Sequence, residues 1–94
     1  MTVIWSAAAI DDIASIRSYI LSRDVQAARR VAQRIRDLAQ TLGDFPSQGR
    51  AGQVEGTREL VLTDYPYIIV YRTDGACVTV VRVIHTARAW PEQG

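Results

Sequence analysis

The chain has 94 residues, 48% of them apolar and 22% charged, which is typical of a single soluble globular domain spanning residues 1–94. A net charge of +1 gives no global field for nucleic acid, and a lone cysteine, Cys77, excludes an internal disulfide and a cysteine-built zinc cage. The N-terminus lacks the basic region of a signal peptide, and no apolar run approaches the ~20 residues of a membrane-spanning helix. We therefore expect a cytoplasmic protein that does not contact the membrane.

The first predicted elements are a short strand over residues 2–5 and a helix over about residues 7–21. Ser6 stands in the N-cap position of this helix, and Asp11 and Asp12 are expected to complement the positive end of its dipole. One apolar stripe at helical spacing is formed by Ile10, Ile13, Ile16 and Ile20.

A second helix is predicted between Asp24, a second N-cap candidate, and Gly43, which supplies the stop. Its apolar positions follow a regular 3-4-3-4 spacing at Ala28, Val31, Ile35, Leu38 and Leu42. Arginines occupy its other faces, as is usual for a solvated helix surface. Because the connection at residues 22–24 is short, the two helices should form an antiparallel hairpin.

Residues 47–57 contain three glycines and little periodicity, which predicts a surface loop. Three β-type runs follow at residues 58–63, 67–72 and 77–85. The predicted order is therefore β-α-α-β-β-β, an α+β domain in which a helical hairpin packs on a largely antiparallel sheet.

The dipeptide Asp74-Gly75 is a strong signal for a two-residue hairpin loop. If it forms that loop, Ile69 opposes Val80, Tyr71 opposes Val78 and Tyr67 opposes Arg82. One face of the sheet can then cover the helices, while the other stays available to a partner. On this register the available face carries Ile68, Val70, Val81, Val83 and His85.

Candidate chemistry centres on His85, the only histidine. No nucleophile elbow accompanies it, a single histidine argues against a transition-metal site, and the loop at residues 47–57 lacks the Gly-Lys-Ser/Thr pattern of a phosphate cradle. No metal or cofactor is therefore expected.

Metal-independent phosphodiester cleavage remains open, with His85 as acid or base and Arg58, Arg82 or Arg88 as cations on the phosphate. The alternative is that His85 is a strand-end residue packed against Trp90. Tyr65 and Trp90 lie in a turn and beyond the last strand, where amphipathic aromatic residues are typical interface anchors.

Fragments along nearly the whole chain resemble the RelE/ParE superfamily of type II toxin–antitoxin toxins, particularly its ParE-like, "plasmid stabilization" branch. In chain order they are Trp5, Ala9, Asp12-Ile13, Ile16, Tyr19-Ile20, Ala28, Ile35, Leu42, Phe45-Pro46, Gly49-Arg50, Gly56-Thr57-Arg58-Glu59-Leu60, Pro66-Tyr67-Ile68-Ile69-Val70-Tyr71-Arg72, Val83-Ile84-His85 and Trp90-Pro91. That superfamily also has the β-α-α-β-β-β order.

The resemblance implies a growth-arresting toxin that a cognate antitoxin holds inactive in a hetero-oligomeric complex. Such antitoxins typically wrap an amphipathic segment around the toxin and carry the DNA-binding part, so operator DNA is contacted only through the antitoxin. On the available face of the sheet, we expect antitoxin contacts at Ile68, Val70, Val81 and Val83.

The resemblance leaves the cellular target open. RelE-like members cut mRNA on the ribosome, whereas ParE-like members poison DNA gyrase and lack the catalytic set. Ile68 stands where ribonuclease members tend to carry arginine, and the chain has no lysine, so we expect a non-enzymatic toxin that binds gyrase. The expected target-binding residues are Arg58, Tyr65, Arg82, His85, Arg88 and Trp90. A ribosome-dependent mRNA endonuclease using His85 with Arg58, Arg82 and Arg88, and a weakly toxic protein serving mainly in operon autoregulation, are the alternatives.

Overall fold

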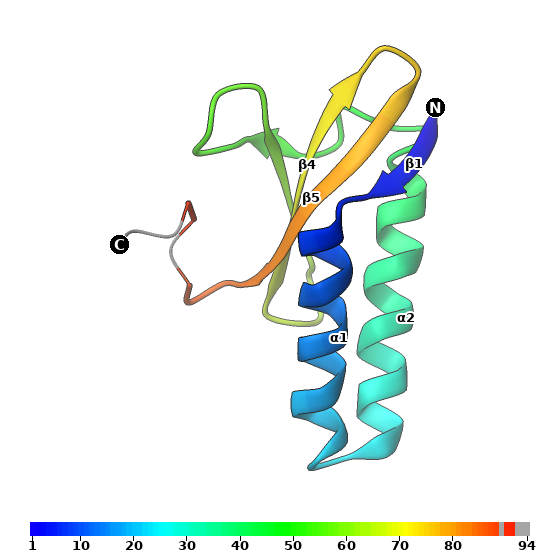
Figure 1. The fold of residues 1–94 in the computed structure, drawn as a ribbon, viewed down its shortest axis with the longest axis vertical. Helices are drawn as coiled ribbons and strands as arrows, with labels where there is room; N and C mark the ends of the chain where they lie inside the picture. The colour runs from blue at the N-terminus through cyan, green and yellow to red at the C-terminus, as the bar shows by residue number, and fades with distance from the viewer. Residues whose placement is uncertain (89, 92–94) are drawn as a thin grey trace.

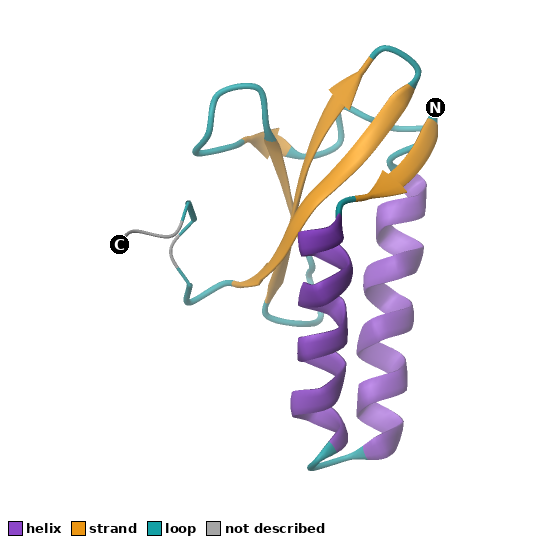
Figure 2. Ribbon diagram, in the orientation of Figure 1, coloured by secondary structure: helices purple, strands orange, loops and turns teal. Residues whose placement is uncertain are grey.

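The computed structural model describes residues 1–88 and 90–91, and it has two helices packed on a five-stranded sheet (Figures 1 and 2). The elements are β1 (Thr2–Trp5), α1 (Ala7–Leu21), α2 (Val25–Thr41), β2 (Arg50–Ala51), β3 (Arg58–Val61), β4 (Tyr67–Asp74) and β5 (Cys77–His85). The predicted α+β class and helical hairpin are confirmed. No helix in the described part of the chain is long and apolar enough to cross a membrane.

The strands lie in the order β1-β5-β4-β3-β2, with β1 parallel to β5 and every other pair antiparallel. The short strand β2 falls inside the segment predicted as a loop. It forms because Arg50 pairs with Glu59 and Ala51 pairs with Arg58 of β3. Two paired residues have no periodicity of their own, so sequence patterning could not reveal this strand.

Both predicted N-caps are confirmed. The Ser6 hydroxyl accepts a hydrogen bond from the Ala9 backbone N–H at 3.0 Å, and the Asp24 carboxylate accepts one from the Ala27 N–H at 3.0 Å. The expected dipole role of Asp11 and Asp12 is wrong, because the first turn of α1 contains no acidic residue. Both lie one turn further along, where the field of the helix end has weakened.

The apolar stripe of α2 is confirmed: Val31, Ile35 and Leu42 are buried against the sheet. In α1, Ile13, Ile16 and Ile20 pack against the same core, but Ile10 is 54% exposed. The predicted stripe of α1 is therefore correct for three of its four residues and wrong for Ile10, which faces solvent.

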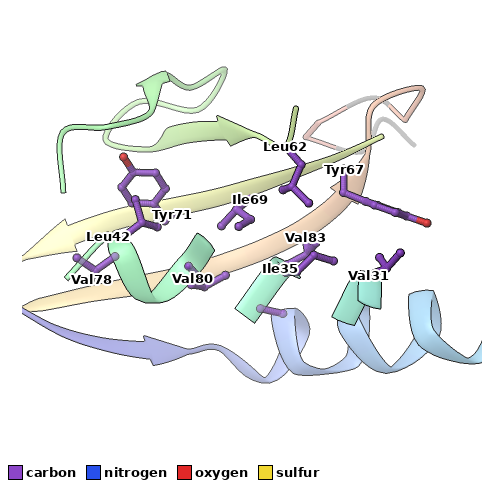
Figure 3. Close-up of a cluster of buried hydrophobic side chains, with 12 residues drawn as sticks. Val31, Ile35, Leu42, Leu62, Tyr67, Ile69, Tyr71, Val78, Val80 and Val83 are labelled. Atoms are coloured by element: carbon purple, nitrogen blue, oxygen red, sulfur yellow. The ribbon is translucent and has the colours of Figure 1, made fainter. Parts of the chain in front are cut away.

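The main core lies between the helices and one face of the sheet. Figure 3 shows Ile69 and Tyr71 of β4 and Val80 and Val83 of β5 on the side of the strands that the helices cover. Tyr71 is fully buried, and its hydroxyl is satisfied by donating to the Pro46 carbonyl and accepting from the Gly49 N–H, both at 2.8 Å. This phenol ties the loop after α2 to the centre of the sheet.

The predicted hairpin register is wrong. Asp74 pairs with Cys77, so the two loop residues are Gly75 and Ala76, and Gly75 has the positive φ of +59° that glycine adopts without strain. Tyr71 therefore opposes Val80, and Tyr67 opposes His85.

A bulge changes the sheet face further along β5. Tyr71 pairs with Val80 but Val70 pairs with Arg82, which leaves Val81 as the extra residue. Beyond the bulge, Val83 and His85 lie on the face covered by the helices, contrary to prediction, and Ile84 lies on the opposite face with Ile68 and Val70. This opposite face is named the open face below.

Candidate functional site

The open face carries a pocket of about 370 Å³, named the open-face pocket. Its lining comes from β2, β3, β4, the end of β5 and the segment after β5. The residues used below are Arg50, Glu59, Ile68, Ile84, Arg88 and Trp90. In Figure 1 the chain after β5 runs on the side of the sheet opposite the helices, which brings Arg88 and Trp90 to this face.

The floor of the pocket is apolar. Ile68 and Ile84 line it and are 8% and 3% exposed, and the fully buried Val70 belongs to the same apolar cluster, although no helix of the described chain covers this face. Val81 and Trp90 pack against these three residues and help to bury them. The indole Nε1 of Trp90 is buried without a hydrogen-bond acceptor in the described residues, so one polar atom remains unsatisfied at this floor.

Glu59 places a carboxylate in the lining of the pocket. It is only 5% exposed and accepts hydrogen bonds from Nη2 of Arg50 at 3.1 Å and from the Gln53 backbone N–H at 3.0 Å. The antiparallel pairing of β2 with β3 sets Arg50 opposite Glu59, which explains the contact. The positive charge of Arg50 is therefore compensated within the chain.

Arg82 is held at the boundary between α1 and the open face. Its Nε and Nη2 donate to the two carboxylate oxygens of Asp12 at 2.7 and 3.0 Å, and its guanidinium carbon lies 5.8 Å from the centre of the Trp90 ring. An arginine in a two-point ion pair has a fixed orientation. Arg82 therefore links the helical layer to the aromatic residue of the open face.

His85 lies on the other side of the sheet. Its ring meets the ring of Tyr67 edge-on, with centroids 5.5 Å apart, and it lines a hollow with Ser15, Ile16 and Tyr19. Its Nδ1 accepts a hydrogen bond from the Ala87 N–H at 3.1 Å, which leaves Nε2 as the donor atom of the neutral ring. Burial raises the pKa of the Tyr67 phenol, and the neighbouring Tyr19 adds to that rise.

Two further predicted target-binding residues also lie away from the open face. Arg58 pairs with Tyr71 on the helix-covered face and donates from Nη1 to the Gly49 carbonyl at 2.9 Å. Tyr65 packs against the core beneath the helices and lines a hollow with Arg34 and Asp64, which form an ion pair at 2.9 Å. The structure thus brings together Arg82, Arg88 and Trp90 and separates them from Arg58, Tyr65 and His85.

The residues predicted to contact the antitoxin are also divided between the two faces of the sheet. Ile68, Val70 and Val81 do lie on the open face, but Val70 is completely buried by the chain itself. Val83 is 2% exposed inside the core under the helices (Figure 3), so its placement on the available face is wrong. Neither Val70 nor Val83 presents its side chain to a partner in this conformation.

Sequence reasoning missed Arg50, Glu59 and Ile84 as pocket residues. Arg50 and Glu59 are nine positions apart and meet only because β2 pairs with β3. Their opposite charges could have suggested an ion pair, but the segment has no periodicity that would place the two residues on neighbouring strands. Within residues 1–88 and 90–91, no group of three or more His, Cys, Asp or Glu side chains could hold a metal ion.

Comparison with known proteins gives one consistent result. A family model described as the ParE toxin of the type II toxin–antitoxin system parDE matches residues 3–90. The chain is 40% identical over 88 residues to Putative toxin Y4kP of Sinorhizobium fredii, covering 94% of this chain and 91% of that protein. It is 37% identical over 86 residues to Toxin RelE2 of Caulobacter vibrioides, covering 92% and 96%.

A solved structure titled chromosomal ParDE TA system from P. aeruginosa has a chain with the same fold. The TM-score is 0.85 at 24% sequence identity, and the match covers 90% of this chain and 95% of that one. At 24% sequence identity, this likeness shows that the two chains share a fold.

Proposed function

Because the chain belongs to the ParE toxin family of type II toxin–antitoxin systems, we propose that it arrests growth by binding DNA gyrase in the cytoplasm. In this proposal the chain itself cuts no substrate, and a cognate antitoxin neutralises it in a hetero-oligomeric complex. The antitoxin also supplies the contact to operator DNA. The gyrase-binding surface is the open face around Arg82, Arg88 and Trp90.

The observation that supports binding over cleavage is the position of His85. A general acid or base must come within hydrogen-bond reach of the reacting atoms. His85 lies on the helix-covered face against Tyr67, whereas Arg88 and Trp90 line the pocket on the opposite face. An RNA phosphate held by the arginines of the open face would therefore be separated from the only imidazole by the sheet.

The pocket chemistry supports the same proposal. Glu59 places a negative charge beside Arg50, and the side chains of Ile68 and Ile84 in the floor carry no hydrogen-bond donor for a phosphate oxygen. An aromatic ring and arginines above an apolar floor are instead typical of the energetic centre of a protein–protein interface. The open face therefore suits the surface of a protein better than a nucleic-acid backbone.

The test is a supercoiling assay with purified DNA gyrase and the purified toxin. Supercoiling should stop, or cleaved DNA should accumulate, and preincubation with the cognate antitoxin should restore activity. Gyrase that keeps working at an excess of folded toxin overturns the proposal. Circular dichroism of the same toxin preparation shows whether the fold was present.

The mRNA endonuclease is the second candidate, and the likeness to the protein named Toxin RelE2 favours it. Primer extension on a translated mRNA would show new ends at the ribosomal A site after toxin induction. Transcripts that stay intact while growth stops exclude this activity and leave gyrase as the target to examine.

A further inference from the structure

A hollow of about 490 Å³, named the α1–β5 hollow, lies between α1, the start of β4 and the end of β5. The residues that line it are Ser15, Ile16, Tyr19, Pro66, Tyr67 and His85. Among the described residues, none of those that line it belongs to α2. The hollow is therefore a feature of the junction between α1 and the sheet.

The polar atoms of the α1–β5 hollow are not used inside the chain. The Tyr67 side chain is 8% exposed, and Figure 3 shows its ring extending away from the other labelled core residues with the hydroxyl at the outer end. Within residues 1–88 and 90–91, this hydroxyl has no hydrogen-bond partner, and neither do the hydroxyls of Ser15 and Tyr19. The Nε2 of the neutral His85 ring is a further donor. Three hydroxyls and one imidazole N–H therefore surround this hollow without a partner in the described chain.

The walls of the hollow are aromatic, and contacts inside the chain hold them in place. The rings of Tyr67 and His85 form a corner, with an angle of 87° between their planes. Tyr19 is 62% exposed, but the Arg23 guanidinium carbon lies 4.2 Å from the centre of its ring. Arg23 also donates from Nη1 to the Tyr19 carbonyl at 3.3 Å. A cation over one face of the ring restrains Tyr19 and leaves the other face for a ligand.

The chemistry of the lining limits the ligand that fits. Within the described chain, no charged side chain lines the hollow, so it provides no ion-pair partner for a carboxylate, a phosphate or an ammonium group. Ser15, Tyr19 and His85 are exposed at its rim. An open rim suits a chain segment that crosses the hollow better than a small molecule that must be enclosed.

A proline-rich segment brings the groups that this lining requires. Its pyrrolidine rings are flat apolar surfaces that pack on aromatic rings, and its carbonyl oxygens accept hydrogen bonds from hydroxyl groups. Proline has no backbone N–H, so the segment leaves few donors unpaired in the hollow.

We propose that the α1–β5 hollow binds a proline-rich segment of a partner protein in the polyproline II conformation. One proline ring packs on the free face of Tyr19 and in the corner between Tyr67 and His85. Backbone carbonyls of the segment accept hydrogen bonds from Ser15 and from the two tyrosine hydroxyls. The hollow lies on the opposite side of the sheet from the open face, and the proposal does not depend on the gyrase activity.

The probe is a fluorescent synthetic peptide of about nine residues, about three turns of polyproline II helix, with proline at most positions. Its binding to the full chain is followed by fluorescence anisotropy. Tyr19→Ala removes the exposed ring and should weaken binding about fivefold or more, and Ser15→Ala should weaken it about threefold through the lost hydroxyl. Phe45→Ala removes an exposed ring outside the hollow, and Ser18→Ala removes an exposed hydroxyl of the same helix. These two variants are the matched controls and should bind as wild type does.

A peptide that does not bind, or that binds Tyr19→Ala as tightly as wild type, overturns the inference, with circular dichroism showing that each protein is folded. A second peptide with alanine in place of every proline should bind more weakly, and equal binding would overturn the recognition of proline. Single-stranded DNA that binds more tightly than the peptide and is released by Tyr19→Ala would make the hollow a site for stacked bases and also overturn the inference. The peptide assay contains no gyrase, so its failure is distinguishable from a failure of the proposed gyrase activity.

Discussion

Arg82 of β5 and Asp12 of α1 form a two-point ion pair across 70 positions of sequence, with Nε–Oδ2 and Nη2–Oδ1 distances of 2.7 and 3.0 Å. The Asp12 carboxylate also accepts the Val83 backbone N–H at 2.9 Å. β1 pairs with β5 only as far as Val80, so this part of the β5 edge has no strand partner. Asp12 satisfies the Val83 donor and holds α1 against the sheet.

Replacing Asp12 with asparagine should destabilise the fold by about 2 kcal/mol, because the two-point ion pair with the mostly buried Arg82 guanidinium loses its negative charge. Urea denaturation followed by circular dichroism measures this as a lower midpoint. Asp11→Asn is the matched control, since Asp11 is the exposed neighbour in the same helix turn. Equal midpoints for the Asp12 variant and the control would show that the pair adds no net stability.

Tyr71→Phe should cost about 1–3 kcal/mol of unfolding free energy, because it leaves the Gly49 N–H and the Pro46 carbonyl without their shared partner. The same change at the exposed Tyr19 removes a hydroxyl that bonds no described residue and should have little effect. Chemical denaturation of both variants makes the comparison. A Tyr71→Phe protein as stable as wild type would indicate that water replaces the phenol.

Stability should fall at alkaline pH partly through Tyr67. Burial raises the pKa of its phenol above the ordinary value of 10.0, so the folded state retains a proton that the unfolded state has released. The contribution is complete below the ordinary pKa and is lost as the pH rises through the raised pKa, because the unfolded state then binds fewer protons.

Urea midpoints measured between about pH 9 and pH 12 test this, and Tyr67→Phe should flatten the decline. Tyr19→Phe removes only the lesser cause of the shift and should flatten it less. An unchanged slope in Tyr67→Phe would assign the alkaline loss of stability to other groups.

The two faces of the sheet should differ in their effect on gyrase. Arg88→Gln removes a charge that lines the open-face pocket, so the toxin concentration needed for half inhibition should rise about fivefold or more. His85→Ala alters the opposite face and should leave that concentration close to the wild-type value. Arg29→Gln, at an exposed position of α2 on the helical side of the sheet, controls for the loss of one positive charge away from the open face.

A result in which His85→Ala abolishes inhibition and Arg88→Gln does not would contradict the assignment of the open face. Thermal melting of each variant separates loss of contact from loss of fold. With the fold intact, the concentration for half inhibition reports on the surface alone.

Local patterning predicted the secondary structure well because its physical causes are local. Ser6 and Asp24 cap their helices through bonds to N–H groups three positions away, and the α2 stripe follows from 3.6 residues per turn. The open face was predicted less well. Its residues come from β2, β3, β4, β5 and the segment after β5, and strand pairing decides which of them meet.

The sequence by itself determined the order of the elements other than β2, both helix caps, the core stripe of α2 and the resemblance that family comparison confirmed. Only the tertiary structure decided which residues of β5 share a face. The bulge in β5 lies where the Ser6 N–H and hydroxyl donate to the Val80 and Val81 carbonyls, and these contacts join residues that are more than 70 positions apart. Beyond that bulge the alternation shifts by one residue, which turns His85 toward the helices and Ile84 toward the open face.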